Sequence, residues 1–182
     1  MKSPTFQFRW CFPLLAFSLL AGCMPAADAN PGIASDTAGQ VVCAAPTDEL
    51  SLAMEVLRLV NVERDNLGLD PVEWSDQLAQ IGDEYGCDMI QGQFFSHVNP
   101  ITGEGPGERA IKGGYLFRLL GENLAVGFNT PEVVVAEWMD SPDHRANLLN
   151  PNWKEMGVGV RIGNYRGAAN MVYWVQEFGE PI

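Results

Sequence analysis

Only two histidines occur in the 182 residues of this chain, and each lies in a polar, turn-rich stretch near carboxylates. His97 follows Ser96, His144 follows Asp143, and Glu122 stands in a Gly-Glu-Asn sequence. Two neutral imidazoles with carboxylates suit a zinc-type ion, and they suit an acid–base pair equally well. A lone histidine is also commonly a surface residue, so the residue types alone leave open whether these side chains share a site.

No residue adds a convincing nucleophile to this set. Ser96 neighbours His97, and Ser141 lies three residues before His144. Both serines stand where a turn or a helix start is expected, and serine is favoured there because its hydroxyl accepts a backbone hydrogen bond. The sequence therefore supports an enzyme less than it supports a binding site.

The first 22 residues are typical of a signal peptide. Lys2 and Arg9 form a thin positive region, and an apolar run over residues 10–21 follows. The run is shorter than the roughly 20 apolar residues that a membrane-spanning helix needs, and it fits the apolar region of a signal peptide. We therefore expect residues 1–22 to be removed and the protein to be exported.

The end of this segment, Leu20-Ala21-Gly22-Cys23, resembles a bacterial lipobox, in which the cysteine becomes the acylated N-terminus. An ordinary signal peptide cut nearby is the alternative. We predict lipidation at Cys23 and therefore a membrane partner through this anchor. A single acyl chain binds membrane only weakly and stable anchoring takes two or more signals, and bacterial lipoproteins resemble the stably anchored case. Met24 rather than an aspartate follows the cysteine, which favours the outer membrane where the cell has one. Residues 23–46 are rich in Ala, Pro, Gly and Ser and predict a flexible tether.

The charge of the chain excludes some partners. The formal net charge is -12, and removal of the first 22 residues leaves nine basic and 23 acidic residues, a net charge of -14. Contacts to phosphates need basic side chains, so such a surface repels nucleic acid and anionic membrane. We expect no nucleic-acid partner, and we expect a monomer on its tether.

Four cysteines leave one candidate pair. Cys11 departs with the signal peptide and Cys23 carries the lipid, so Cys43 and Cys87 remain. Disulfides persist where exported proteins reside, and closing a loop of about 45 residues would stabilise the fold by roughly 4 kcal/mol. The alternative is a free, buried thiol at Cys87 on a helix, with Cys43 an ordinary residue of the tether.

The order of the expected elements indicates the fold class. Apolar residues recur at helical spacing from Thr47 to Gly68 and again after Ser75, and Gly82 and Gly86 share one face of the second helix, which indicates a close-packed neighbour. We also expect helices over 108–113, 131–140 and 141–150, a strand within 119–126, and two strands over 156–162 and 170–178. Helices first and strands last predict an α+β fold, a small sheet flanked by helices, in one domain over residues 47–182.

From about residue 54 to 178 the chain resembles the CAP superfamily (cysteine-rich secretory, antigen 5 and pathogenesis-related class 1 proteins), and its bacterial branch in particular. Seven stretches match in family order. They are Leu59-Val-Asn61-Val-Glu-Arg64 with Leu67-Gly68-Leu69-Asp-Pro71-Val-Glu-Trp74-Ser75; Cys87-Asp88-Met89; Phe95-Ser96-His97; Pro106-Gly-Glu-Arg109-Ala110 with Gly114-Tyr115; Gly121-Glu122-Asn123-Leu124-Ala125; Trp138-Met-Asp-Ser141-Pro142-Asp-His144-Arg145-Ala-Asn147-Leu-Leu149-Asn150-Pro151; and Gly157-Val-Gly159-Val160. The resemblance implies an α-β-α sandwich with a central antiparallel sheet.

The resemblance also implies a cleft that holds two histidines and two acids. His97 and His144 match the histidines, and Glu122 matches the acid of the Gly-Glu-Asn motif. In the family the second acid lies three residues after a tryptophan that matches Trp138, and this position holds Ser141 here. Of its acidic neighbours we expect Glu137, rather than Asp140, to be the second cleft acid.

Three functions are compatible with this cleft. The first is a non-enzymatic binding module on the cell envelope, whose histidines hold a divalent metal such as zinc beside a small-molecule, lipid or peptide ligand. The second is a metal-dependent, peptidase-like hydrolase with Glu122 or Glu137 as its base. The third is a structural or adhesive lipoprotein with a vestigial cleft.

Overall fold

The computed structural model describes residues 42–182. The expected signal peptide, the lipidation site at Cys23 and most of the expected tether lie outside these residues. Within them no helix is long and apolar enough to cross a membrane.

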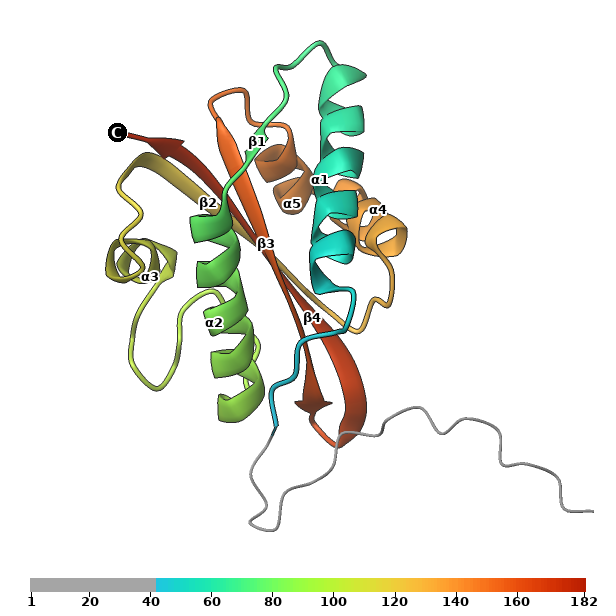
Figure 1. Cartoon of the computed structure of the whole chain (residues 1–182), viewed down its shortest axis with the longest axis vertical. Coiled ribbons are helices and arrows are strands. Elements are labelled where there is room, and N and C mark those ends of the chain that lie inside the picture. Colours follow the sequence, from blue (N-terminus) through green and yellow to red (C-terminus); the bar gives the residue numbers. More distant parts are fainter. Residues whose placement is uncertain (1–41) are drawn as a thin grey trace, which may run out of the picture. The chain divides into compact units, whose positions relative to one another are not determined.

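Five helices and four strands make up this part of the chain (Figure 1). They confirm the helices-first, strands-last order expected from the sequence, with two differences. The two-residue strand Glu73–Trp74 was not expected, and the first helix begins two residues later than expected, after Asp48. In chain order they are α1 (Glu49–Asp65), β1 (Glu73–Trp74), α2 (Asp76–Gly92), α3 (Pro106–Lys112), β2 (Phe117–Val126), α4 (Pro131–Asp140), α5 (Pro142–Leu148), β3 (Glu155–Tyr165) and β4 (Ala168–Pro181).

The strands form one sheet in the order β1-β3-β4-β2, with helices on both faces, which is an α-β-α sandwich. β3 pairs antiparallel with β4, and β4 pairs antiparallel with β2. The three long strands are antiparallel, as expected, and the sheet is mixed only because the two-residue strand β1 runs parallel to β3. The segment between α1 and α2 passes from one face of the sheet to the other around the β3 edge, and it pairs over only two residues on the way.

The two faces of the sheet carry separate cores. One face packs against α1, α4 and α5 around the buried side chains of Trp138, Trp153 and Trp174. The other packs against α2 around Tyr85 and Met89, and a smaller cluster joins α2 to α3. Because side chains alternate along a strand, successive residues of β2 and β4 enter different cores.

Glycines set the distance between α2 and the sheet. A Cβ atom at Gly82 would lie 2.9 Å from the backbone nitrogen of Gly159, and one at Gly157 or Gly159 would overlap the backbone of α2. The close-packed neighbour expected for Gly82 is therefore β3, while Gly86 lies against the side chain of Arg161. This contact holds α2 directly over the middle of the sheet.

Cys43 and Cys87 form a disulfide, with their Cα atoms 5.3 Å apart, so Cys87 is not a free thiol. Next to it, Ala44 exchanges two backbone hydrogen bonds with Ile162 of β3, at 2.9 and 2.7 Å. The start of the described chain is thus fixed to α2 by a covalent bond and to β3 by a short bridge.

Arg64 of α1 fixes the end of α5. Its guanidinium is fully buried and donates to the carbonyls of Asp70, Leu148 and Asn150, each at 2.9 Å. A buried guanidinium needs such acceptors, and the bonds to Leu148 and Asn150 hold the segment that follows α5. Arg64 therefore anchors the C-terminal end of α5, the helix that carries His144.

Candidate functional site

A pocket of about 450 Å³ lies at the β2 edge of the sheet, between the loop that follows α2 and helix α5. The structure brings His97, His144 and Glu122 together in this pocket, from three separate segments. Its lining is formed by His97, Glu122, Asn123, Asp143, His144, Ala146 and Asn147. The three side chains that the sequence singled out therefore share one site.

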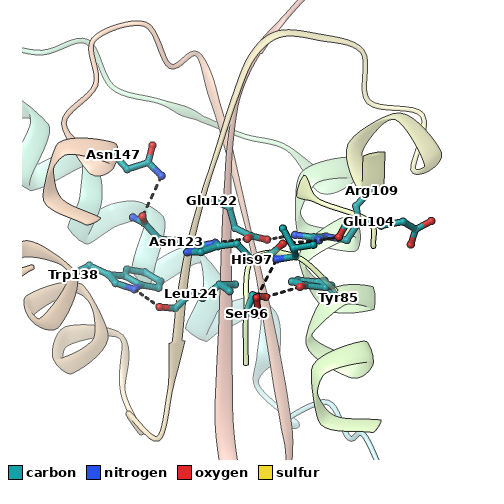
Figure 2. Close-up of polar contacts among 11 residues, drawn as sticks. Tyr85, Ser96, His97, Glu104, Arg109, Glu122, Asn123, Leu124, Trp138 and Asn147 are labelled. Atoms are coloured by element: carbon teal, nitrogen blue, oxygen red, sulfur yellow. Dashed lines mark hydrogen bonds and ion pairs between the residues drawn. The ribbon is translucent and has the colours of Figure 1, made fainter. Parts of the chain in front are cut away.

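His97 is held by its ring and by its backbone (Figure 2). Its Nδ1 lies 2.6 Å from Oε1 of Glu122, while about half of the side chain (54%) stays exposed. Arg109 donates to the His97 carbonyl at 3.0 Å, and the Tyr85 hydroxyl donates to the Ser96 carbonyl at 2.5 Å. These contacts fix the loop that presents the imidazole to the pocket.

Glu122 and Arg109 form a buried ion pair. Nη2 of Arg109 lies 2.5 Å from Oε2 of Glu122, and the two side chains are only 7% and 1% exposed. The guanidinium stacks over the ring of Tyr85, with its central carbon 3.3 Å from the ring centroid. Burial raises the pKa of Tyr85 to about 12, so its hydroxyl remains a donor. A charge-assisted bond of this kind offsets the cost of burying the Glu122 carboxylate.

A second carboxyl group lies beside Glu122 and was missed in the sequence. Glu177 of β4 is the direct cross-strand partner of Glu122 and is 1% exposed. Burial, followed by the charge of the neighbouring Glu122, raises the pKa of Glu177 well above its usual range, against the attraction of Arg109. The signal was present as an acid inside the buried run from Tyr173 to Phe178.

His144 stands on α5, on the opposite side of the pocket. Burial, and to a lesser extent the neighbouring His97, lower its pKa against the opposing effect of Asp143, so the imidazole is neutral at pH 7. Asn123 donates to the His144 carbonyl at 3.3 Å. Asn147 donates to Oδ1 of Asn123 at 3.1 Å (Figure 2). The residue next to Glu122 in β2 thus fixes the second histidine.

Glu137, the expected second cleft acid, does not line the pocket. It is exposed on α4, because the adjacent Trp138 is buried in the core with its indole nitrogen 3.3 Å from the Leu124 carbonyl. Asp140 is exposed on the same helix. Asp143 lines the pocket instead, at the start of α5.

The tautomer of His97 follows from its partner. Glu122 also accepts from Arg109, so we assign it as a carboxylate and place the proton of the imidazole on Nδ1. The lone pair of Nε2 is then free to act as an acceptor or a metal ligand. Among residues 42–182, no three His, Cys, Asp or Glu side chains lie in a group that could hold a metal ion, so any ion would take most of its ligands from water.

Replacing Arg109 by Leu should leave the Glu122 charge buried without its cation and lower the free energy of unfolding by about 3–5 kcal/mol. Urea unfolding at pH 7 measures this loss. Arg118→Leu is the matched control, because its ion pair with Glu180 is 3.7 Å long and the arginine is 65% exposed, and exposed pairs contribute at most about 1 kcal/mol. Equal losses in the two variants would contradict a structural role for the buried pair.

Comparison with known sequences places the whole site inside one family. The sequence profile of the CAP family (Cysteine-rich secretory protein family) matches residues 57–178. The protein YkwD of Bacillus subtilis (strain 168) is 35% identical over 135 residues, which cover 74% of this chain and 49% of YkwD. The membrane protein YlbC of the same organism is 34% identical over 106 residues, 58% of this chain and 30% of YlbC. The chain thus spans half or less of each of these two relatives.

Solved structures agree with the fold. An extracellular protein containing a SCP domain from Bacillus anthracis is similar with a TM-score of 0.64 and 27% identity, over 75% of this chain and 44% of that one. An outer surface protein of Borrelia burgdorferi has a TM-score of 0.66 at 22% identity, over 78% of this chain and 99% of that one. With the profile match extending over two thirds of its length, the chain belongs to the CAP family of cysteine-rich secretory proteins.

Proposed function

We propose that this protein is an exported CAP-domain lipoprotein, anchored to the cell envelope through Cys23, whose pocket binds a divalent metal such as zinc and a small ligand without catalysing a reaction. The observation that carries the binding role is the 2.6 Å contact between Glu122 and Nδ1 of His97. A carboxylate in this position fixes the ring and raises the basicity of the opposite nitrogen, as it does behind many metal-bound histidines.

The side chains of the pocket fit a metal with an open coordination shell. Nε2 of His97 and the neutral ring of His144 would be the protein ligands, and water would complete the shell. Zinc supplies a Lewis acid there when it is bound. Glu122 orients His97 from behind, and Asn123 holds the backbone of His144.

The lining favours a small, polar ligand over a lipid. Six of the seven lining residues carry polar or charged side chains, and Ala146 is the exception. The lining contains no arginine or lysine, and the guanidinium of Arg109 behind it is buried and neutralised by Glu122, so the side chains of the lining do not favour an anion. An uncharged or cationic ligand with hydrogen-bonding groups, such as a peptide segment, suits this surface best.

The two acids expected as a general base, Glu122 and Glu137, are poorly placed to activate a water, which favours binding over hydrolysis. Both oxygens of Glu122 already accept hydrogen bonds, one from His97 and one from Arg109. Glu137, the other candidate base, is exposed on α4 outside the lining. A base that activates water needs a free oxygen within hydrogen-bond reach of it.

The location in the envelope rests on the leader sequence and on the relatives. The apolar run over residues 10–21 and the lipobox-like end at Cys23 support export and lipidation. The similar structures from Bacillus anthracis and Borrelia burgdorferi are described as an extracellular and an outer surface protein.

Replacing Cys23 by Ser should remove the lipid and move the protein from the membrane fraction to the soluble fraction of the envelope or the medium. Labelling with palmitate in the native host, followed by fractionation, measures both effects. Replacing Cys11 by Ser is the matched control, because that cysteine lies within the cleaved segment, and it should leave the labelling unchanged. Membrane retention and labelling of the Cys23 variant would contradict the anchor.

Zinc should bind the mature protein, residues 23–182, with a stoichiometry of about one, and His97→Ala or His144→Ala should each abolish this binding in calorimetry. Glu122→Gln should weaken it by about tenfold, because it removes the charge behind His97. Glu137→Gln is the control and should bind like the wild type. Binding that survives both histidine variants would place the metal elsewhere.

Zinc affinity should rise from pH 5 to pH 8, because each imidazole must lose its proton before it can bind metal. The lowered pKa of His144 keeps that ligand unprotonated, and able to bind metal, at a pH below the 6.5 or so of an ordinary imidazole. Calorimetry at five pH values, corrected for buffer ionisation, measures the profile. A flat affinity across this range would rule out a site made of two histidines.

A further inference from the structure

Glu177 is a buried acid whose carboxyl group has no hydrogen-bond donor among the described residues. Its side chain is 1% exposed, and neither carboxyl oxygen has a hydrogen-bond donor among residues 42–182. Glu122 lies directly across the strand pair and has two donors, His97 and Arg109. Buried polar groups are nearly always hydrogen-bonded, so an acid with no donor at all requires an explanation.

Charge gives the first part of the explanation. Two ionised carboxylates at this position would face a single guanidinium, that of Arg109, away from bulk solvent. Like charges that share a buried site do not both stay ionised, because burial and repulsion both favour the neutral form of one of them. The pair of acids therefore holds one proton.

Hydrogen bonding decides which acid carries it. Glu122 is stabilised as an anion by donors on both of its oxygens, whereas Glu177 receives none. We propose that Glu177 is a neutral carboxylic acid that donates a hydrogen bond to Glu122 and holds this carboxylate in place for His97. Glu177 is thus a positioning residue for the pocket, supplied by the middle of the sheet.

This hydrogen bond bears directly on the imidazole. With the proton on Glu177, Glu122 keeps its negative charge and accepts from Nδ1–H of His97, which leaves Nε2 unprotonated toward the pocket. An ionised Glu177 would instead repel Glu122 and draw the guanidinium of Arg109 toward itself. The consequence for metal binding rests on the proposed function, but the protonation of Glu177 does not.

One competing arrangement gives the opposite protonation state. Nε of Arg109 also has no partner among the described residues, and a buried water between it and an ionised Glu177 would serve both groups. This arrangement predicts no neutral acid at residue 177, so a measurement of protonation separates the two.

The first experiment is an infrared difference spectrum between the mature protein and its Glu177→Gln variant at pH 7. The wild type should show the carbonyl band of a protonated carboxylic acid that the variant lacks. The difference is needed because burial raises the pKa of Asp83 to about 7, so that residue contributes a band of its own to both proteins. Absence of a band in the difference spectrum would overturn the proposal in favour of the ionised, water-bridged arrangement.

The second experiment uses nitrogen NMR of the histidine rings, which is simple to assign because the chain has only two histidines. Glu177→Gln keeps a donor toward Glu122 and should retain the Nδ1–H tautomer of His97 seen in the wild type. Glu177→Leu removes the donor and should give a mixture of tautomers. Glu180→Gln, on the same strand but in an exposed ion pair, is the control and should match the wild type. A Leu variant identical to the wild type would overturn the positioning role.

Zinc calorimetry on the same variants completes the test. Glu177→Leu should bind about tenfold more weakly, the usual loss when a group behind a metal-bound histidine is removed, and Glu177→Gln should restore the affinity. Equal zinc affinity in the Leu variant and the wild type would also count against the positioning role. If the wild type binds no zinc, the proposed metal function fails, while the infrared and NMR results still decide the state of Glu177.

Discussion

The carboxylate of Glu122 is the charge around which the pocket is organised. At 1% exposure it has lost its water, and an unpaired ion in that state would cost several kcal/mol. Arg109 supplies the cation, and the same guanidinium also donates to the carbonyls of His97 and Glu104. One side chain of α3 therefore neutralises the acid and fixes two points of the loop that carries His97. The position of His97 is a consequence of how this single charge is compensated.

The two halves of the pocket come from opposite faces of the sheet and meet at its edge strand. Glu122 belongs to the face covered by α2, and Asn123 belongs to the face covered by α5, because successive side chains of a strand alternate. Glu122 holds the ring of His97, and Asn123 holds the backbone of His144. A pair of consecutive residues thus positions two histidines that are 47 positions apart in the chain. Strand β2 can do this only as an edge, where the loop and α5 both reach around it.

Local patterns in the sequence predicted the helices well. The signals for a helix, such as the N-cap Ser75 of α2 and Pro131 at the first position of α4, depend only on residues a few positions away. His97, His144 and Glu122 were grouped through family resemblance, which carries spatial information that periodicity lacks. Glu177 could not be found in this way, because its meeting with Glu122 depends on the register between strands 55 residues apart. The sequence predicted Glu137 as the second acid of the pocket, whereas the structure has Asp143 in the lining. The reason is related: the burial of Trp138 in the core sets the rotation of α4, and no local pattern near residue 137 indicates that rotation.

The disulfide between Cys43 and Cys87 also determines how the domain bears a mechanical load. Any pull on the chain ahead of residue 43 reaches α2 through a covalent bond, and the adjoining bridge from Ala44 passes it to Ile162 in β3. Both receiving elements meet in the close contact that glycines allow between α2 and β3, where α2 lies against the sheet (Figure 1). A pull ahead of residue 43 is therefore shared with α2 and β3 and does not fall on α1 alone.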